Sequence, residues 1–296
     1  MLICSSHTIS GVMPGAPEVT RHGFEERVNA CAEAGFDGMC LHVRDHAKWR
    51  AEGRDDAWMR AVLDRHAMAV PAVEFLADWH DGTDDADQTL AAALAAARCF
   101  GADVLNVGAD IAGRGVPPRD LARPFVRLCE RAADAGVRIA LEVLAWGSVS
   151  DLDAATVLLD AAHGTAGSGR PGLVVDCWHV FRGGRIGLDD LRRLDPALIL
   201  GVQLNDAPAG VAGPPPVDTM RRHFCGHGTF DITGFLRAVR GALPAAPVAV
   251  EVIAPEVAAL PLDVAARRAA TSARTALASA GLADAVAGTG GRPGAR

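Results

Sequence analysis

The chain alternates between short apolar runs and longer stretches with helical periodicity. Eight apolar runs are predicted to be strands, at residues 3–9, 38–44, 70–77, 104–109, 138–144, 172–178, 199–204 and 247–253. The stretches between them are amphipathic or alanine-rich. Several begin near an acidic residue and end at glycine, as helix ends prefer. This alternation is typical of parallel strands joined by crossover helices.

Eight strand–helix units over 296 residues favour a single-domain α/β fold, the (β/α)8 TIM barrel. The alternative, a doubly wound sheet, usually shows a glycine-rich phosphate loop after its first strand. The segment SSHTISGVMPG (residues 5–15) does not match G-x-G-x-x-G and does not open directly into a helix. We expect the barrel to span residues 1–286 and the Gly/Arg-rich residues 287–296 to form a disordered tail.

The composition narrows the class of partner. The formal net charge is -7 and no block of lysine and arginine occurs, which excludes nucleic acid as the main partner. No apolar run is long enough to span a membrane, and the first residues lack the features of a signal peptide. The seven cysteines are scattered and form no C-x-x-C pair, which favours a reduced, cytoplasmic setting. These observations leave a small molecule as the expected substrate.

Four predicted strands in succession end in an oxygen-bearing side chain. Glu142 ends the fifth strand, Asp176 the sixth, Gln203 the seventh and Glu251 the eighth. A single acidic residue at such a position is most often a solvated charge or a helix cap. Four on consecutive strands are harder to explain in that way, because the C-terminal ends of barrel strands meet at one mouth.

Carboxylates that converge repel one another, and a divalent cation removes the repulsion. Oxygen ligands suit Mn²⁺ best here, with Mg²⁺ or Co²⁺ as alternatives. The pattern therefore predicts a metal site at the barrel mouth.

Several motifs resemble the xylose isomerase-like TIM-barrel family. They are EVLAWG, VVDCWHVFRGG, VQLNDAP, FCGHGTFDITGFL and VAVEVIAP, together with AGFDGMCLHVRD and GADVLNVG. The family includes sugar-phosphate isomerases and epimerases, ketose 3-epimerases, inosose dehydratases and 3-dehydroshikimate dehydratases. The resemblance covers nearly the whole chain. Its D-x-x-H unit at residues 176–179 and its late strand glutamate are typical of the superfamily rather than of one substrate.

The resemblance implies roles for individual residues. Glu142, Asp176, Gln203 and Glu251 would be the metal ligands, and Glu142 and Glu251 would also exchange the proton with the substrate. Many relatives have histidine where Gln203 stands. The dehydratase branch resembles this chain both in that glutamine and in E-x-L-A-W-G.

The substrate would be contacted by a second set of residues, namely His179, Arg222, Glu74, Trp146 and His7. Arg221 is the alternative to Arg222 as the substrate-binding arginine. Either residue could instead be a surface arginine without a role in binding. His179 has the alternative of a core histidine bonded to a backbone carbonyl group. We expect His42 to fill the core, and the role of His227 in the G-x-G turn stays open.

The resemblance implies proton abstraction next to a carbonyl group and a metal-bound enediolate. Our first prediction is an isomerase or epimerase of a sugar or sugar phosphate. The alternative is a lyase of the 3-dehydroshikimate or inosose dehydratase type. A phosphate-cradling loop is missing, so phosphate specificity has no support. An endonuclease of this superfamily would need more histidine ligands at the strand ends and a basic face for DNA, and the sequence shows neither. A non-catalytic barrel is another alternative, but it would have no need of the metal ligands. Relatives suggest a homodimer.

Overall fold

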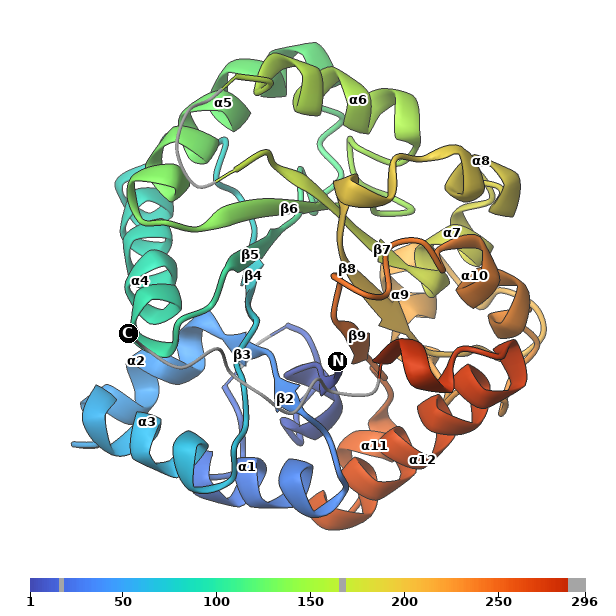
Figure 1. Ribbon diagram of the computed structural model, residues 1–296. Helices are drawn as coiled ribbons and strands as arrows, with labels where there is room; N and C mark the ends of the chain where they lie inside the picture. Colours follow the sequence, from blue (N-terminus) through green and yellow to red (C-terminus); the bar gives the residue numbers. More distant parts are fainter. Residues whose placement is uncertain (16–18, 165–168, 287–296) are drawn as a thin grey trace.

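Nine parallel strands, joined side by side, form the wall of a barrel surrounded by helices (Figure 1). The computed structural model describes residues 1–15, 19–164 and 169–286, so the predicted tail at 287–296 lies outside the described residues. The strands are β1 (Leu2–Cys4), β2 (Gly38–Met39), β3 (Leu41–His42), β4 (Ala72–Leu76), β5 (Val104–Val107), β6 (Arg138–Glu142), β7 (Gly172–Asp176), β8 (Ile199–Leu204) and β9 (Val248–Val250).

The two outermost strands of the sheet, β2 and β3, are consecutive in the chain. The strand order is β2-β1-β9-β8-β7-β6-β5-β4-β3, and only Cys40 separates β2 from β3. The backbone N–H of Cys40 donates to the carbonyl group of Cys4 on the β1 side, whereas the N–H of Met39 donates to that of Ala69, next to β4. The segment 38–42 is therefore one interrupted strand that closes the ring. The predicted single-domain TIM barrel is confirmed.

The helices pack around the ring and follow the predicted periodic segments. They are α1 (Phe24–Glu33), α2 (Val43–Ala51), α3 (Asp56–Arg65), α4 (Asp84–Phe100), α5 (Pro118–Asp134), α6 (Leu152–Ala161), α7 (Cys177–Gly183), α8 (Leu188–Arg193), α9 (Pro215–Asp218), α10 (Ile232–Ala238), α11 (Pro255–Ala258) and α12 (Leu262–Ala280). Helix α4 illustrates how residues at the ends of such a segment fix its limits. The Thr83 hydroxyl accepts from the N–H of Ala86 at the start, and Gly101 adopts a left-handed conformation at the end.

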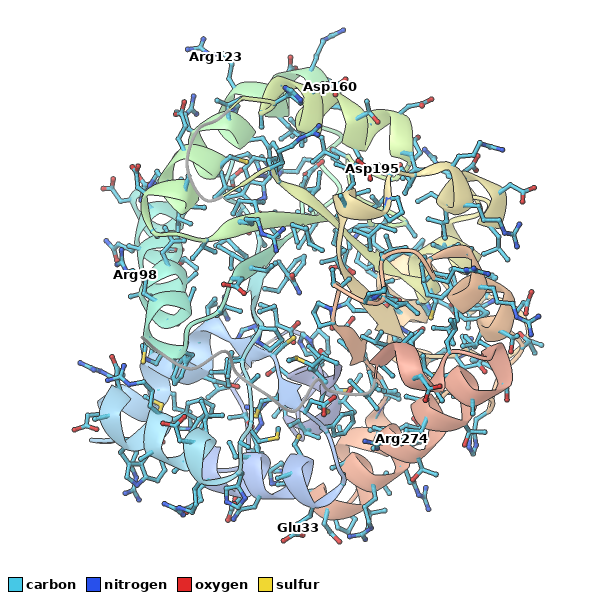
Figure 2. All side chains as sticks on the ribbon, viewed as in Figure 1. Glu33, Arg98, Arg123, Asp160, Asp195 and Arg274 are labelled. Carbon is cyan, nitrogen blue, oxygen red and sulfur yellow. The ribbon has the colours of Figure 1, made fainter. Side chains whose placement is uncertain are left out.

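The outer faces of these helices are charged. Glu33, Arg98, Arg123, Asp160 and Arg274 lie on these helices and are exposed, as is Asp195 in the segment after α8 (Figure 2). No helix in the described ranges is long and apolar enough to cross a membrane. All seven cysteines are free thiols, and only Cys99 is not buried.

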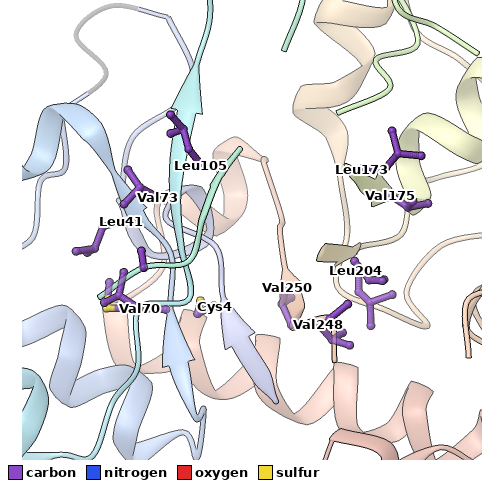
Figure 3. Packing of buried hydrophobic residues seen from close by; sticks show 14 of the residues in the cluster. Cys4, Leu41, Val70, Val73, Leu105, Leu173, Val175, Leu204, Val248 and Val250 are labelled. Atoms are coloured by element: carbon purple, nitrogen blue, oxygen red, sulfur yellow. The ribbon is translucent and has the colours of Figure 1, made fainter. Parts of the chain in front are cut away.

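Alternation along the strands separates two apolar cores. On β9, Val248 and Val250 face the helices, where they join a large cluster between the sheet and the helix layer (Figure 3). Ala249 points the other way, into the barrel. If the interrupted segment 38–42 is counted as one strand, the ring has eight strands, and each contributes one residue to the interior layer. These residues are Ile3, Cys40, Ala72, Val104, Ala140, Val174, Leu200 and Ala249. This apolar layer closes the floor of the barrel beneath the mouth.

Most strands are shorter than predicted, because the apolar runs continue into the loops at the mouth. The first run covers residues 3–9, but β1 ends at Cys4 and a 3-10 helix occupies His7–Ile9. The sixth run, 172–178, turns at Asp176, whose side chain accepts from the N–H of Trp178 and starts α7. Residues on both sides of such a turn are buried, so apolarity alone does not mark the end of the strand.

Candidate active site

A second layer of buried residues lies directly above the apolar floor, and this layer is polar. It begins two residues after the apolar layer on each strand, or three on β8, where the register with β7 shifts by one residue. Side chains two residues apart on a strand share a face. The layer consists of Ser5, His42, Glu74, Asn106, Glu142, Asp176, Gln203 and Glu251, all buried. The four residues predicted as ligands thus stand at neighbouring strand ends inside the barrel.

A cavity of about 580 Å³ opens above this layer, within the size range of small-molecule sites. Glu142 and Glu251 line it, as do the five residues predicted to contact the substrate, namely His7, Glu74, Trp146, His179 and Arg222. Asp176 and Gln203 lie beneath its surface and are not part of its lining. His42 is buried, as expected, but it also lines the cavity.

Arg222 is the central cation of the site. Its Nη1 donates to Asp176 Oδ2 at 2.7 Å and to Glu251 Oε2 at 2.8 Å. The hydroxyl group of Thr219 accepts from Nε and Nη2, and the guanidinium lies 5.6 Å from the ring of Trp178. The residue is 2% exposed. Because every one of these contacts is shielded from water, Arg222 neutralises part of the charge of the buried carboxylates.

A tightly fixed loop holds Arg222 in place. Its N–H donates to the carbonyl group of Ile253 at 3.1 Å. Further along the loop, Oδ2 of Asp206 accepts from the N–H groups of Gly226 and Gly228, each at 3.0 Å. Gly226 has a φ of +80°, and a Cβ at Gly228 would lie 2.2 Å from a backbone oxygen. Asp206 also follows strand β8, but its side chain accepts hydrogen bonds from the loop and is not one of the converging carboxylates.

The neighbouring candidates lie outside the cavity. Arg221 pairs with Asp218 at 2.9 Å, and its side chain is 40% exposed. His227, in the middle of the G-x-G turn, is exposed and packs its ring near Phe224, 6.5 Å away between centroids. The structure thus separates Arg222 from Arg221, and it gives His227 no position in the cavity wall.

His179 and Glu142 form a hydrogen-bonded pair in the cavity wall. The N–H of Ala145 donates to His179 Nδ1 at 3.2 Å, so the ring proton lies on Nε2, which is 3.2 Å from Glu142 Oε1. Burial raises the pKa of Glu142 above its usual value, more than the hydrogen bond from His179 lowers it. The centroid of the Trp146 ring lies 5.2 Å from that of the imidazole, and both rings line the cavity.

Two further carboxyl groups differ in their charge environment. Burial raises the pKa of Glu251, but the hydrogen bond from His7 and the charge of Arg222 outweigh it and hold that pKa well below its usual range. Burial raises the pKa of Glu74 to about 7, and the nearby charge of Glu251 adds to the effect. Glu251 is therefore the more acidic of the two groups.

The donor atoms fit a hard divalent cation. The ligand atoms of Glu142, Asp176 and His179 lie within 4.8 Å of one another. Gln203 pairs in register with Asp176 on one side and with Ala249, two residues before Glu251, on the other. Its Oε1 is buried and has no hydrogen-bond partner among the described residues. An orphaned amide oxygen is costly unless a donor or a cation binds it. Glu142, Asp176, Gln203 and Glu251 would hold such an ion.

Substitutions of Gln203 test this ligand set directly. Gln203→Leu removes the oxygen at similar volume and should abolish Mn²⁺ binding, whereas Gln203→His supplies a nitrogen donor and should keep it. Isothermal titration calorimetry with Mn²⁺ measures both. Equal affinity in the leucine variant and the unsubstituted protein would exclude Gln203 as a ligand.

Two members of the polar layer were not predicted. Asn106 lies in β5, one residue before its end, and Ser5 follows β1; both are buried. Serine and asparagine are common where strands pass into loops, so residue type gave no signal. Their spacing of two residues from Val104 and Ile3 would have indicated that they face the barrel interior.

Known proteins share this fold, although most are distant in sequence. The chain is 29% identical over 235 residues to a 3-dehydroshikimate dehydratase of Pseudomonas aeruginosa, covering 77% of this chain but 36% of that protein. The chain thus spans about a third of the length of this curated relative.

Two solved structures superpose with most of the chain. The IolI protein, whose crystal structure contains a zinc atom, has a TM-score of 0.77 at 16% identity, covering 94% of this chain and 98% of IolI. A D-allulose 3-epimerase from Methylomonas sp. has a TM-score of 0.64 at 17% identity, covering 93% and 97% of the two chains. At these identities the likeness concerns the fold.

The family profile described as xylose isomerase-like TIM barrel matches residues 28–276, from α1 to the last long helix. The matched range includes eight of the nine strands and all four proposed ligands, Glu142, Asp176, Gln203 and Glu251. With the ring topology and the polar mouth, this match identifies the chain as a member of the xylose isomerase-like TIM barrel family.

Proposed function

We propose that the protein is a divalent-metal-dependent dehydratase, which removes water from a cyclic polyhydroxy ketone of the 3-dehydroshikimate or inosose type. The observation that carries the proposal is the match over 77% of the chain with a 3-dehydroshikimate dehydratase. The glutamine at position 203 and the EVLAWG segment, by which the chain resembles the dehydratase branch, support it as well. These findings favour the lyase over the isomerase or epimerase that was our first prediction.

The reaction needs a base at the carbon next to the carbonyl group. Glu142 and Glu251 both line the cavity, and we assign the first proton transfer to Glu142, whose partner His179 is fixed by the N–H of Ala145. Glu251 is paired with Arg222 and stays ionised. A divalent ion held by the four proposed ligands would polarise the carbonyl group and stabilise the negative charge that develops. The oxygen donors favour Mn²⁺ or Mg²⁺.

The second candidate is an isomerase or epimerase of a sugar or sugar phosphate. The fold likeness to D-allulose 3-epimerase and the presence of two carboxyl groups in one cavity wall favour it. In that reaction the proton returns to the substrate, whereas in a dehydration a hydroxyl group leaves from the adjacent carbon. The two reactions share their first step, so the fate of that hydroxyl group distinguishes them.

Proton exchange in D₂O with added Mn²⁺ tests the proposal. We would incubate the protein with ketoses, ketose phosphates, inososes and 3-dehydroshikimate, and follow α-proton exchange and products by NMR. The expected result is loss of water from 3-dehydroshikimate or an inosose. A recovered or rearranged sugar with deuterium at the α-carbon would instead establish the second candidate.

A further inference from the structure

Two arginines line the cavity, and they differ in what they contact. Among the described residues that form the lining, Arg44 and Arg222 are the only arginine or lysine side chains. Arg222 is occupied by the two carboxylates and the threonine hydroxyl group described above. Arg44 is exposed, and its side chain makes no hydrogen bond or ion pair with any residue that the structure describes. Its guanidinium is therefore available to a ligand.

The backbone that carries Arg44 is firmly held at the mouth of the barrel. Its N–H donates to Nδ1 of His42 at 3.3 Å, a contact that caps the start of α2. The residues on either side, Val43 and Asp45, are buried. Oδ2 of Asp45 accepts from Nη1 of Arg27 at 2.6 Å. The long side chain of Arg44 thus starts from a fixed point and lies along the cavity wall.

Arg44 stands across the mouth from the proposed metal ligands. The segment 38–42, which precedes it, lies opposite β7 in the ring, because β1, β9 and β8 separate the two on one side and β4, β5 and β6 on the other. Strand β7 carries Asp176, and the other three proposed ligands lie at the ends of its neighbours β6 and β8 and of β9. A molecule held by a carbonyl group at these ligands would turn its far end toward Arg44.

Most of the charge on the cavity wall is negative. Six carboxyl side chains line it, namely Glu74, Asp78, Asp81, Asp85, Glu142 and Glu251. An anionic group on a ligand therefore needs a cation at the place where it binds. The planar fork of a guanidinium matches the two oxygens of a carboxylate, whereas hydroxyl groups are bound equally well by neutral side chains. An arginine without a protein partner in an acidic cavity indicates a carboxylate on the ligand.

We propose that Arg44 binds a carboxylate group of the substrate and so sets the specificity of the site. The inference rests on the proposed dehydratase function and narrows its substrate class. The substrate is a cyclic hydroxy ketone that carries a carboxylate, as 3-dehydroshikimate does, and not an uncharged inosose. Arg44 contacts the end of the substrate that is remote from the carbonyl group, so it contributes to binding and takes no part in the proton transfer.

The first test measures binding and needs no turnover. Catechol differs from 3,4-dihydroxybenzoate, the compound that remains when 3-dehydroshikimate loses water, only in lacking the carboxylate. Calorimetric titration of the Mn²⁺-loaded protein should give an affinity for 3,4-dihydroxybenzoate that is roughly 10-fold or more above that for catechol. Arg44→Met should remove this preference and leave the affinity for catechol unchanged. Arg44→Lys keeps the charge without the fork and should retain part of the preference.

Arg50→Met is the matched control. Arg50 lies on the same helix, is exposed, pairs with Asp56 at 2.9 Å and is not part of the cavity lining. Its replacement should alter neither affinity. If the unsubstituted protein binds the two ligands equally, or if Arg44→Met keeps the preference for the carboxylate, the inference is wrong.

A kinetic test separates binding from chemistry. With 3-dehydroshikimate as the substrate, Arg44→Met should raise KM by roughly 10-fold and leave kcat within about twofold of normal, because the lost contact is the same in the ground state and the transition state. A fall in kcat at unchanged KM would contradict the inference. Failure of the proposed function has another signature: the unsubstituted protein would then release no water from 3-dehydroshikimate, while the binding comparison would still report on Arg44.

Discussion

Replacing Glu251 with glutamine is expected to lower turnover by roughly 10²-fold or more, because the proposed metal ion, which would stabilise the developing negative charge, loses a charged ligand. The amide keeps the shape of the side chain but removes a negative charge from the proposed ligand set. It also breaks the charge-assisted contact with Arg222 Nη1, now 2.8 Å long. Mn²⁺ affinity should fall together with kcat. Steady-state kinetics on the substrate found by proton exchange, with calorimetric titration of Mn²⁺, measures both quantities.

Glu256→Gln is the matched control. Glu256 lies five residues further along, is exposed and belongs to the first turn of α11, so its replacement should change neither kcat nor Mn²⁺ affinity. Unchanged melting temperatures would show that both variants fold. Normal turnover in Glu251→Gln would remove Glu251 from the proposed mechanism, even if the metal still bound.

Replacing Arg222 with methionine is expected to destabilise the metal-free protein by about 3–5 kcal/mol, the usual cost of removing one partner from a buried ion pair. Asp176 and Glu251 would keep their charges in the interior without the guanidinium between them. Added Mn²⁺ should restore much of the lost stability, because a cation would again lie among these carboxylates. Urea unfolding with and without Mn²⁺ measures the effect.

Arg221→Met provides the comparison at the adjacent position. Its ion pair with Asp218 is half-exposed, and Asp218 retains a second partner in Arg182 at 3.0 Å. The expected loss is below about 1 kcal/mol, with no recovery on adding Mn²⁺. Equal losses in the two variants would mean that Arg222 does not hold the carboxylates together.

The ring topology and the four oxygen-bearing strand ends could be predicted because they leave a local signal in the sequence. A buried parallel strand is a continuous apolar run, and Glu142, Asp176, Gln203 and Glu251 interrupt such runs near their ends. In a barrel these positions meet by construction, so no knowledge of long-range contacts was needed.

Other features depend on contacts that the sequence does not encode locally. Arg221 and Arg222 are adjacent and chemically identical. The path of the loop distinguishes them, and it is fixed by contacts with residues distant in the sequence, Asp206 and Ile253. The partnership of Ser5 with Glu74 arises where three strand ends converge. The interruption at Cys40 likewise lies where one segment bonds to β1 on one side and to β4 on the other.

Closure of the ring also determines when the candidate site is formed. Strand β1 is among the first parts of the barrel to leave the ribosome, yet its sheet neighbour β9 is made almost last, and the Ser5–Glu251 contact joins residues 246 positions apart. Contacts of such high sequence separation form late, because the chain entropy lost in joining distant segments must be overcome first. A nascent chain that has not yet been translated through β9 therefore has an open sheet and an incomplete carboxylate layer. The protein should acquire metal affinity and activity together, at the final step of its folding.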